Sequence, residues 1–392
     1  MSKTDVDVNV DEVVKLIEDV YGKRSETGAS AQGTQNAGGV ESTSRSIPVN
    51  SKELLMKVLL DTAENYSVSG YAKRAKDCFD GNIYLGLDKG EEYERQATKV
   101  NQAIMRVTGA EAFALALQET RTVLAGGAAD DLSVTVKVLA GLCRHWFDLP
   151  DGVHMDTGRR NEVVPEVVPP PQCPGDFTYP SGYIFNPDPG ETPGPGFGAL
   201  LMQAVLRFVA ELRAANRLPN GVLSRAVFEA FPSGEDDLVA RTIIGVMMGK
   251  LPTTTFNVFI ALSMWRANGA ATFTALQQAL GQHGERDPYL RASAALKQPL
   301  IQAIQLKPVP PAIWRTATKP HTLGTDQVNP GDIIEINIAN ATREDFDACI
   351  IDAFPVFGGD RRATPHPTHA CPGYEMAFGI MLGIINGLME PV

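Results

Sequence analysis

Apolar residues recur at steps of three and four positions along most of the chain after residue 50. This spacing places apolar side chains on one face of an α-helix. It predicts helices over residues 51–65, 91–107, 110–124, 132–147, 197–216, 236–268 and 292–306. Pro299, inside the last of these, either kinks that helix or starts its second part. Because few stretches alternate with a period of two, we expect a mainly α-helical protein.

The clearest β pattern lies between residues 314 and 338. The turn Asn329-Pro330-Gly331-Asp332 separates two short strands, over 314–324 and 328–338, and the second alternates well. We therefore expect one small β-sheet beside the helices.

Two stretches have no such periodicity. In residues 1–23, five apolar residues on one face predict one short helix, and residues 24–47 have the composition of a disordered linker. We expect residues 1–50 to be a flexible arm and residues 51–392 to be a single domain. The arm's helix is either a stray amphipathic tail or a docking peptide for a partner.

Residues 150–198 are rich in proline and glycine, which predicts an irregular segment without a long helix. Such an insertion is either a functional lid or a surface loop wrapped on the domain. As a lid, its apolar and aromatic residues would line an access channel: Phe177, Tyr179, Tyr183, Ile184 and Phe185.

Composition excludes several classes of protein. The net charge of −11 argues against nucleic-acid binding, which needs a basic surface. Five cysteines without regular spacing argue against a disulfide framework and for a reducing, cytoplasmic compartment. We find no long uncharged apolar run and no signal-peptide pattern, so we expect no membrane anchor.

One cysteine stands where a chemical role is expected. Cys371 follows a Pro/Gly-rich loop and precedes the apolar run Phe378 to Leu388, which predicts a buried helix. At a helix N-terminus the dipole and the unpaired N–H groups favour a thiolate, and a thiolate on a rigid loop is a suitable axial ligand for haem iron. The alternatives are a buried free cysteine, or a zinc site built from His366, His369 and Cys371, although no Cys-x-x-Cys partner exists.

The residues around Cys371 resemble the haem-thiolate signature of cytochrome P-450, Phe-Gly-x-Gly-x-His-x-Cys-x-Gly with an alanine four residues later. The residues in register are His369, Cys371, Gly373 and Ala377. The places of the phenylalanine and the two loop glycines hold Thr364, Pro365 and Pro367. The resemblance implies a cytochrome P-450-like fold that binds haem b through Cys371, with His369 and Gly373 in the cofactor-binding loop.

Further blocks resemble the same family in the same order. Residues 314–338 are similar to its Arg-x-Ala … Gly … Ile-Pro-x-Gly-Asp block, which implies that Arg315 reaches a haem propionate. Residues 88–96 resemble its propionate-binding helix faintly, and there Arg95 or Lys99 would replace the missing partners. Gln302 and Gln305 stand where the family has a Glu-x-x-Arg pair.

The helix predicted over residues 236–268 resembles the family's central distal helix. The family's break carries Ala-Gly-x-Asp/Glu-Thr, whereas this chain has no carboxylate beside Pro252, Thr253 and Thr254, the residues we single out as catalytic. Because the acid and alcohol supply protons to bound dioxygen, the loss of the acid favours a peroxide, which already carries the electrons. The Cys371-Pro372-Gly373 sequence also resembles the family's peroxygenase branch.

These observations lead to three functional hypotheses. The first is an oxidoreductase that oxidises or rearranges a small apolar organic substrate with a peroxide or a substrate hydroperoxide. The second is a dioxygen-dependent monooxygenase with a ferredoxin-type partner, for which Arg343, Arg361 and Arg362 would form a basic docking patch. The third is a non-catalytic haem-binding protein.

Overall fold

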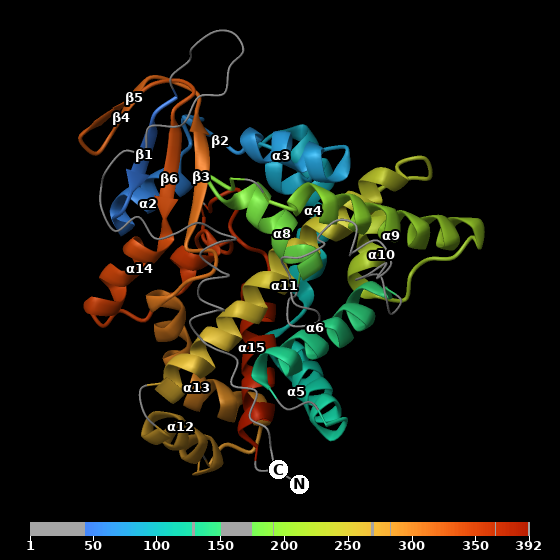
Figure 1. Cartoon of the computed structure of the whole chain (residues 1–392), viewed down its shortest axis with the longest axis vertical. Helices are drawn as coiled ribbons and strands as arrows, with labels where there is room; N and C mark the ends of the chain where they lie inside the picture. Colours follow the sequence, from blue (N-terminus) through green and yellow to red (C-terminus); the bar gives the residue numbers. More distant parts are fainter. Residues whose placement is uncertain are drawn as a thin grey trace.

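A computed structural model describes residues 44–127, 130–149, 175–190, 192–267, 270–282, 284–364 and 366–390. Within them, helices form most of the molecule and a small sheet lies at one end (Figure 1). The first helices are α2 (Lys52–Leu59), α3 (Ser69–Phe79), η1 (Tyr84–Gly86), α4 (Glu91–Arg106), α5 (Gly109–Ala125) and α6 (Asp131–Phe147). The middle ones are α8 (Gly175–Phe185), α9 (Gly194–Ala214), α10 (Val222–Ala230), α11 (Asp236–Ala267), α12 (Ala270–Gln282) and α13 (Pro288–Leu306). The last are α14 (Ile338–Asp347), η2 (Phe354–Phe357) and α15 (Tyr374–Met389).

Local sequence sets where several of these helices begin. The Thr108 side chain caps α5 by accepting a hydrogen bond from the Glu111 N–H, and the Glu111 carboxylate accepts one from the Thr108 N–H, which completes a capping box. Asp130 caps α6 through the Ser133 N–H. The predicted mainly helical fold with a small sheet is therefore confirmed, although the short helices α3, α10, α12 and α14 were not predicted.

The sheet has the strand order β1 (Ser46–Val49), β6 (Ile333–Asn337), β3 (Ala312–Ala317) and β2 (Tyr66–Ser67). Strand β3 pairs antiparallel with β6. The strand predicted over 314–324 is in fact two strands, β3 and β4 (His321–Leu323), and β4 pairs with β5 (Asp326–Val328) in a separate hairpin.

The end of the expected flexible arm is part of this sheet. Strand β1 runs parallel to β6, and its residues Ile47 and Val49 are buried against Ile334 and Ile336. The interpretation of residues 46–49 as flexible is therefore wrong, since two alternating apolar residues suffice once a neighbouring strand covers them. The short helix predicted in residues 1–23 lies outside the described residues.

The Pro/Gly-rich stretch is partly helical. Helix α8 spans eleven residues with Pro180 inside it, and α9 begins at Gly194. The prediction of an irregular segment is wrong there, because packing of α8 against α9 and α11 outweighs the helix-breaking effect of proline. Residues 150–174 lie outside the described part of the chain.

Helix α11 runs through the middle of the molecule and continues past Pro252 (Figure 1). It and α9 are both long and apolar enough to cross a bilayer, yet 83% of the tested α11 window is buried inside the protein. A core helix has this property without spanning a membrane.

Helices α5 and α15 pack closely because α15 carries a glycine every four residues. A methyl group on Gly383 would lie 2.6 Å from the Phe113 carbonyl oxygen, and one on Gly387 would lie 2.6 Å from Thr120 Cγ2. This close approach fixes α15, and with it the loop that carries Cys371.

Gln305, the second residue of the Gln-x-x-Gln pair, bonds to backbone carbonyls and not to a charged side chain. Gln305 Nε2 donates to the carbonyl oxygens of Ile350 and Asp352, at 2.8 and 2.9 Å. These bonds connect α13 to the segment that leads into η2.

Candidate functional site

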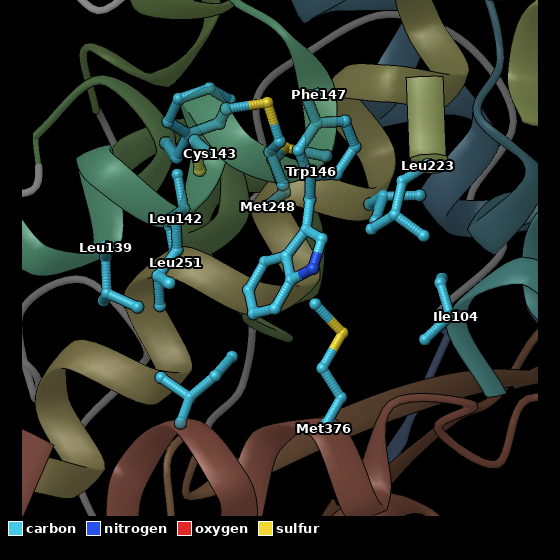
Figure 2. Packing of buried hydrophobic residues seen from close by; sticks show 14 of the residues in the cluster. Ile104, Leu139, Leu142, Cys143, Trp146, Phe147, Leu223, Met248, Leu251 and Met376 are labelled. Carbon is cyan, nitrogen blue, oxygen red and sulfur yellow. The ribbon is translucent and has the colours of Figure 1, made fainter. Parts of the chain in front are cut away.

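A cavity lies between α4, α11, β3, α15 and the loop that precedes α15. Its volume is about 1470 Å³ when its opening to solvent is included. Apolar residues form much of its lining, and Figure 2 shows several of them around Trp146. Among the described residues, no Asp or Glu lines this cavity, although Lys250, Arg315, Arg361 and His369 all do. The cavity of this acidic protein is therefore cationic.

Cys371 lies at the cavity wall, two residues before the Gly373 N-cap of α15. Its N–H donates to the Phe357 carbonyl at 2.8 Å, and the Gly373 N–H donates to its Sγ at 3.3 Å. The predicted position at a helix start is confirmed. Burial raises the pKa of the Cys371 thiol, while the Gly373 N–H and the Arg361 charge act in the opposite direction. The helix start therefore acts on the Cys371 pKa in the expected direction, but burial outweighs it, and a bound cation would have to overcome the burial.

Arg361 holds the cysteine loop in place. Its guanidinium donates to the carbonyls of Thr368 and Ala370 at 2.9 and 2.8 Å, and Tyr93 donates to the same Thr368 carbonyl at 2.7 Å. The expectation that Arg361 belongs to a basic surface patch is wrong, because its bonds to the loop carbonyls place it in the cavity wall beside Tyr93.

The other two residues of that patch are exposed and paired nearby. Arg343 bonds Asp347 at 2.9 Å, and Arg362 bonds Glu375 at 3.4 Å. A basic docking patch built from all three arginines is therefore not formed.

Arg315 and His369 lie near Arg361 at the same end of the cavity. Arg315 is buried, and its Nη1 donates to Tyr71 Oη and to the Trp314 carbonyl at 2.8 and 2.7 Å. Burial, and then the charges of Arg315 and Arg361, lower the pKa of His369 to about 3, although a bond with the Leu87 backbone opposes this. With His369 neutral at pH 7, Arg315 and Arg361 make this end of the cavity cationic and suited to carboxylates.

The two residues of α4 proposed to contact a propionate lie elsewhere. Arg95 is exposed and pairs with Glu92 and Glu235, at 2.8 and 3.1 Å. Lys99 is exposed and donates to the Glu229 carbonyl at 2.9 Å. Neither lines the cavity, so this expectation for Arg95 and Lys99 is wrong. Instead, Tyr93 of α4 lines the cavity. The family motif in this region concerns charged contacts to a propionate, so it did not indicate Tyr93.

The three residues singled out on α11 are placed differently. Thr253 and Thr254 line the cavity, and Thr253 Oγ1 donates back to the Gly249 carbonyl at 2.8 Å. Pro252 is buried inside the helix and does not line the cavity. A role for Pro252 is therefore indirect, through the backbone bond that it removes.

Lys250, on the same helix face as Thr253 and Thr254, was not singled out. Its Nζ is buried with no hydrogen-bond partner among the described residues, and it lies 4.0 Å from the Trp146 ring centroid. A lysine three residues before a cavity threonine, within an apolar helix, was the signal that could have identified it.

The zinc alternative is not supported by the geometry. His366 is exposed whereas His369 is half-buried near Arg315, and the described residues contain no group of three or more His, Cys, Asp or Glu that could hold a metal.

No protein-family model matches the sequence, and no curated protein matches it either. Solved structures of cytochromes P-450 match at probability 1.00. A mutant of cytochrome P-450 EryK in complex with erythromycin B is 15% identical over 96% of this chain and 88% of that chain, with a TM-score of 0.60. A zebrafish cytochrome P-450 with abiraterone is 14% identical over 95% of this chain and 90% of that chain, with a TM-score of 0.65.

A third structure is MycCI from Micromonospora griseorubida, a mycinamicin VIII methyl hydroxylase bound to mycinamicin VIII. It is 16% identical over 88% of this chain and 82% of that chain, with a TM-score of 0.62. At such low identity these matches concern the fold, and they confirm the cytochrome P-450-like fold that the cysteine loop and the β block predicted.

Proposed function

We propose that this chain, which has the cytochrome P-450 fold, is a haem-thiolate oxidoreductase that acts on a small apolar organic substrate. The observation that carries the proposal is Cys371 at the wall of an apolar cavity whose other end is cationic and which no described carboxylate lines. Haem b needs a soft axial ligand for iron and partners for two carboxylates, so this set of donors fits it. We further propose that the protein acts in the cytoplasm.

Each of these residues has a defined task in the proposal. Cys371 would bind the haem iron, and the Gly373 N–H at 3.3 Å from Sγ would tune the electron density on sulfur. Arg315, Arg361 and His369 hold the propionates. When bound, haem supplies the oxidative chemistry, and the protein orients the substrate and excludes water.

The α11 face bears on the choice of oxidant. Thr253 and Thr254 line the cavity, Thr253 Oγ1 is bonded to Gly249, and no carboxylate of the described residues stands beside them. A peroxide already carries its electrons and protons, so it needs no acid–alcohol relay. We therefore propose a peroxide or a substrate hydroperoxide as the oxidant.

The first experiment is the absorption spectrum of the reduced protein exposed to carbon monoxide. We expect a strongly red-shifted Soret band that disappears in Cys371→Ala and persists in Cys349→Ala, since Cys349 is an exposed cysteine. If both variants keep the wild-type spectrum, Cys371 is not the ligand.

Turnover of an apolar substrate then tests the oxidant. We expect product with hydrogen peroxide or an organic hydroperoxide alone. Product that appears only with dioxygen, a reductase and a ferredoxin would refute the peroxide proposal in favour of a monooxygenase, and no product from any oxidant with haem bound would indicate a haem-binding protein.

A further inference from the structure

Arg315 keeps part of its guanidinium unbonded at the cavity wall. Its Nη1 donates to Tyr71 Oη at 2.8 Å and to the Trp314 carbonyl oxygen at 2.7 Å, which uses both hydrogens of that nitrogen. Its Nε and Nη2 have no hydrogen-bond partner among the described residues, and Arg315 lines the cavity. Because Nε and Nη2 form one edge of the planar guanidinium fork, this edge is available to bind a carboxylate through two parallel bonds.

The Tyr71 hydroxyl determines which edge of Arg315 is available. Its oxygen lies 3.1 Å from the Trp314 nitrogen and 2.6 Å from the Trp314 carbonyl oxygen. A backbone N–H and a guanidinium can only donate, so the phenol must donate its single proton to the carbonyl and accept from Trp314 and Arg315. The hydrogen-bonding capacity of this oxygen is therefore used in full, and its contact with Arg315 can only be that of an acceptor.

The fold holds the Tyr71 side chain in this place. Strand β2 pairs with only the last two residues of β3, and α3 follows β2 directly in the chain. The Tyr71 ring meets the rings of Phe185 and Trp314 edge-on, with centroids 5.1 and 5.0 Å away. Helix α3 comes this close because a methyl group on Gly70 would lie 2.1 Å from Trp314 Cη2. The hydroxyl therefore bonds the part of β3 that β2 is too short to cover.

We propose that Tyr71 is a positioning residue for a carboxylate site at Arg315. This assignment rests on the proposed function, in which the carboxylate is a haem propionate. Tyr71 does not line the cavity, so it acts through Arg315. Without the hydroxyl, Arg315 loses one of its two acceptors, and the ordering of its flexible side chain opposes carboxylate binding instead.

Two porphyrins that differ only at their carboxylates test the proposal. Haem b and its dimethyl ester are each loaded into the full-length protein, and the rate at which each transfers to excess apomyoglobin is measured. From the wild type the ester should leave about tenfold or more faster than haem, because it lacks the charges that pair with Arg315. From Tyr71→Phe haem should leave about tenfold faster than from the wild type, since a hydrogen bond to a charged group is lost, while the rate for the ester should change little.

Two further variants locate this effect. Tyr66→Phe removes a hydroxyl of β2 that bonds His321 away from the cavity, and it should behave as the wild type with both porphyrins. In Arg315→Leu, adding Tyr71→Phe should leave the haem rate unchanged, because the group that Tyr71 positions is already absent. A merely structural role for Tyr71 would instead speed the loss of both porphyrins in either background.

Three results would overturn the proposal. In the first, the wild type releases both porphyrins at one rate. In the second, Tyr71→Phe keeps the wild-type ratio of the two rates. In the third, Tyr71→Phe speeds the loss of haem equally with and without Arg315.

The carbon monoxide spectrum of each sample separates these results from failure of the proposed function. A haem-thiolate band with an unchanged ratio in Tyr71→Phe refutes the role of Tyr71 alone. A ratio that falls in Tyr71→Phe, in a protein without the band, supports the role of Tyr71 and refutes Cys371 as the ligand. A wild type that retains neither porphyrin overturns both, because Arg315 then has no propionate to bind.

Discussion

Replacing Lys250 by methionine should make the folded protein more stable at pH 7. Folding buries the Lys250 ammonium and lowers its pKa from the ordinary 10.5 to about 8. At about 1.4 kcal/mol for each pH unit, this fall corresponds to a cost of roughly 3 kcal/mol. The contact with Trp146 offsets up to about 2 kcal/mol of it and is lost in the variant. We therefore expect the free energy of unfolding to rise by about 1 to 3 kcal/mol.

The pH dependence follows from the direction of this pKa change. Between pH 8 and 10.5 the unfolded chain keeps a proton on Lys250 that the folded protein has released, so wild-type stability rises with pH across this window. Below pH 8 the cost is fully present. The advantage of Lys250→Met should therefore be largest at pH 7 and disappear near pH 10.5.

Urea unfolding followed by circular dichroism measures this difference at several pH values from 7 to 10.5. Other groups that titrate in this range are common to both proteins and cancel in the comparison. Lys137→Met, at an exposed site, should change stability by less than about 0.5 kcal/mol at every pH. A variant less stable than the wild type at pH 7, or an advantage that does not change with pH, would refute the reasoning.

Two further predictions concern the scaffold and the cysteine loop. Gly383→Ala should lower the free energy of unfolding by about 1 to 3 kcal/mol, because the new methyl group would lie 2.6 Å from the Phe113 carbonyl oxygen. Gly281→Ala should raise the free energy of unfolding by roughly 0.5 to 1 kcal/mol, because nothing lies within 4 Å of its new methyl group. Urea unfolding measures both changes. Arg361→Leu should lower the ratio of haem to protein after dialysis, because the cysteine loop loses its two guanidinium bonds, and Tyr93→Phe, which removes one bond to the same loop, should have a smaller effect. Equal haem ratios in wild type and Arg361→Leu would show that the loop keeps its shape without this anchor.

A stability cost at Lys250 is informative in itself. Buried unpaired charges are uncommon because they destabilise the fold, and binding sites are where such costs are retained.

Local patterns were sufficient for the framework of the site. The steps of three and four from Met376 to Leu388 predicted α15, and the loop before it placed Cys371 at the helix start, as observed. The alternation in residues 328–338 predicted β6, the strand that pairs with β3, on which Arg315 lies. These features depend on neighbours in sequence, which is why residue spacing reveals them.

Positions that depend on other elements were not predictable in this way. Arg95 and Arg361 are both arginines beside a motif, yet only Arg361 reaches the cavity, because backbone carbonyls of the cysteine loop accept its hydrogen bonds. Strand β1 and helix α8 form where neighbouring elements cover their apolar residues, which outweighs weak local propensity.

The sequence by itself determined the helical class, the strand that became β6, the position of Cys371 before α15 and the absence of an acid beside Pro252. Only the tertiary structure decided that the pKa of Cys371 rises through burial and that Arg315, Arg361 and His369 meet at one end of a cavity. It also decided that Lys250 Nζ lies against Trp146 with no hydrogen-bond partner in the described part of the chain. The reason is physical: periodicity records which face of an element is apolar, whereas the charge and solvation of a side chain depend on what folding brings against it.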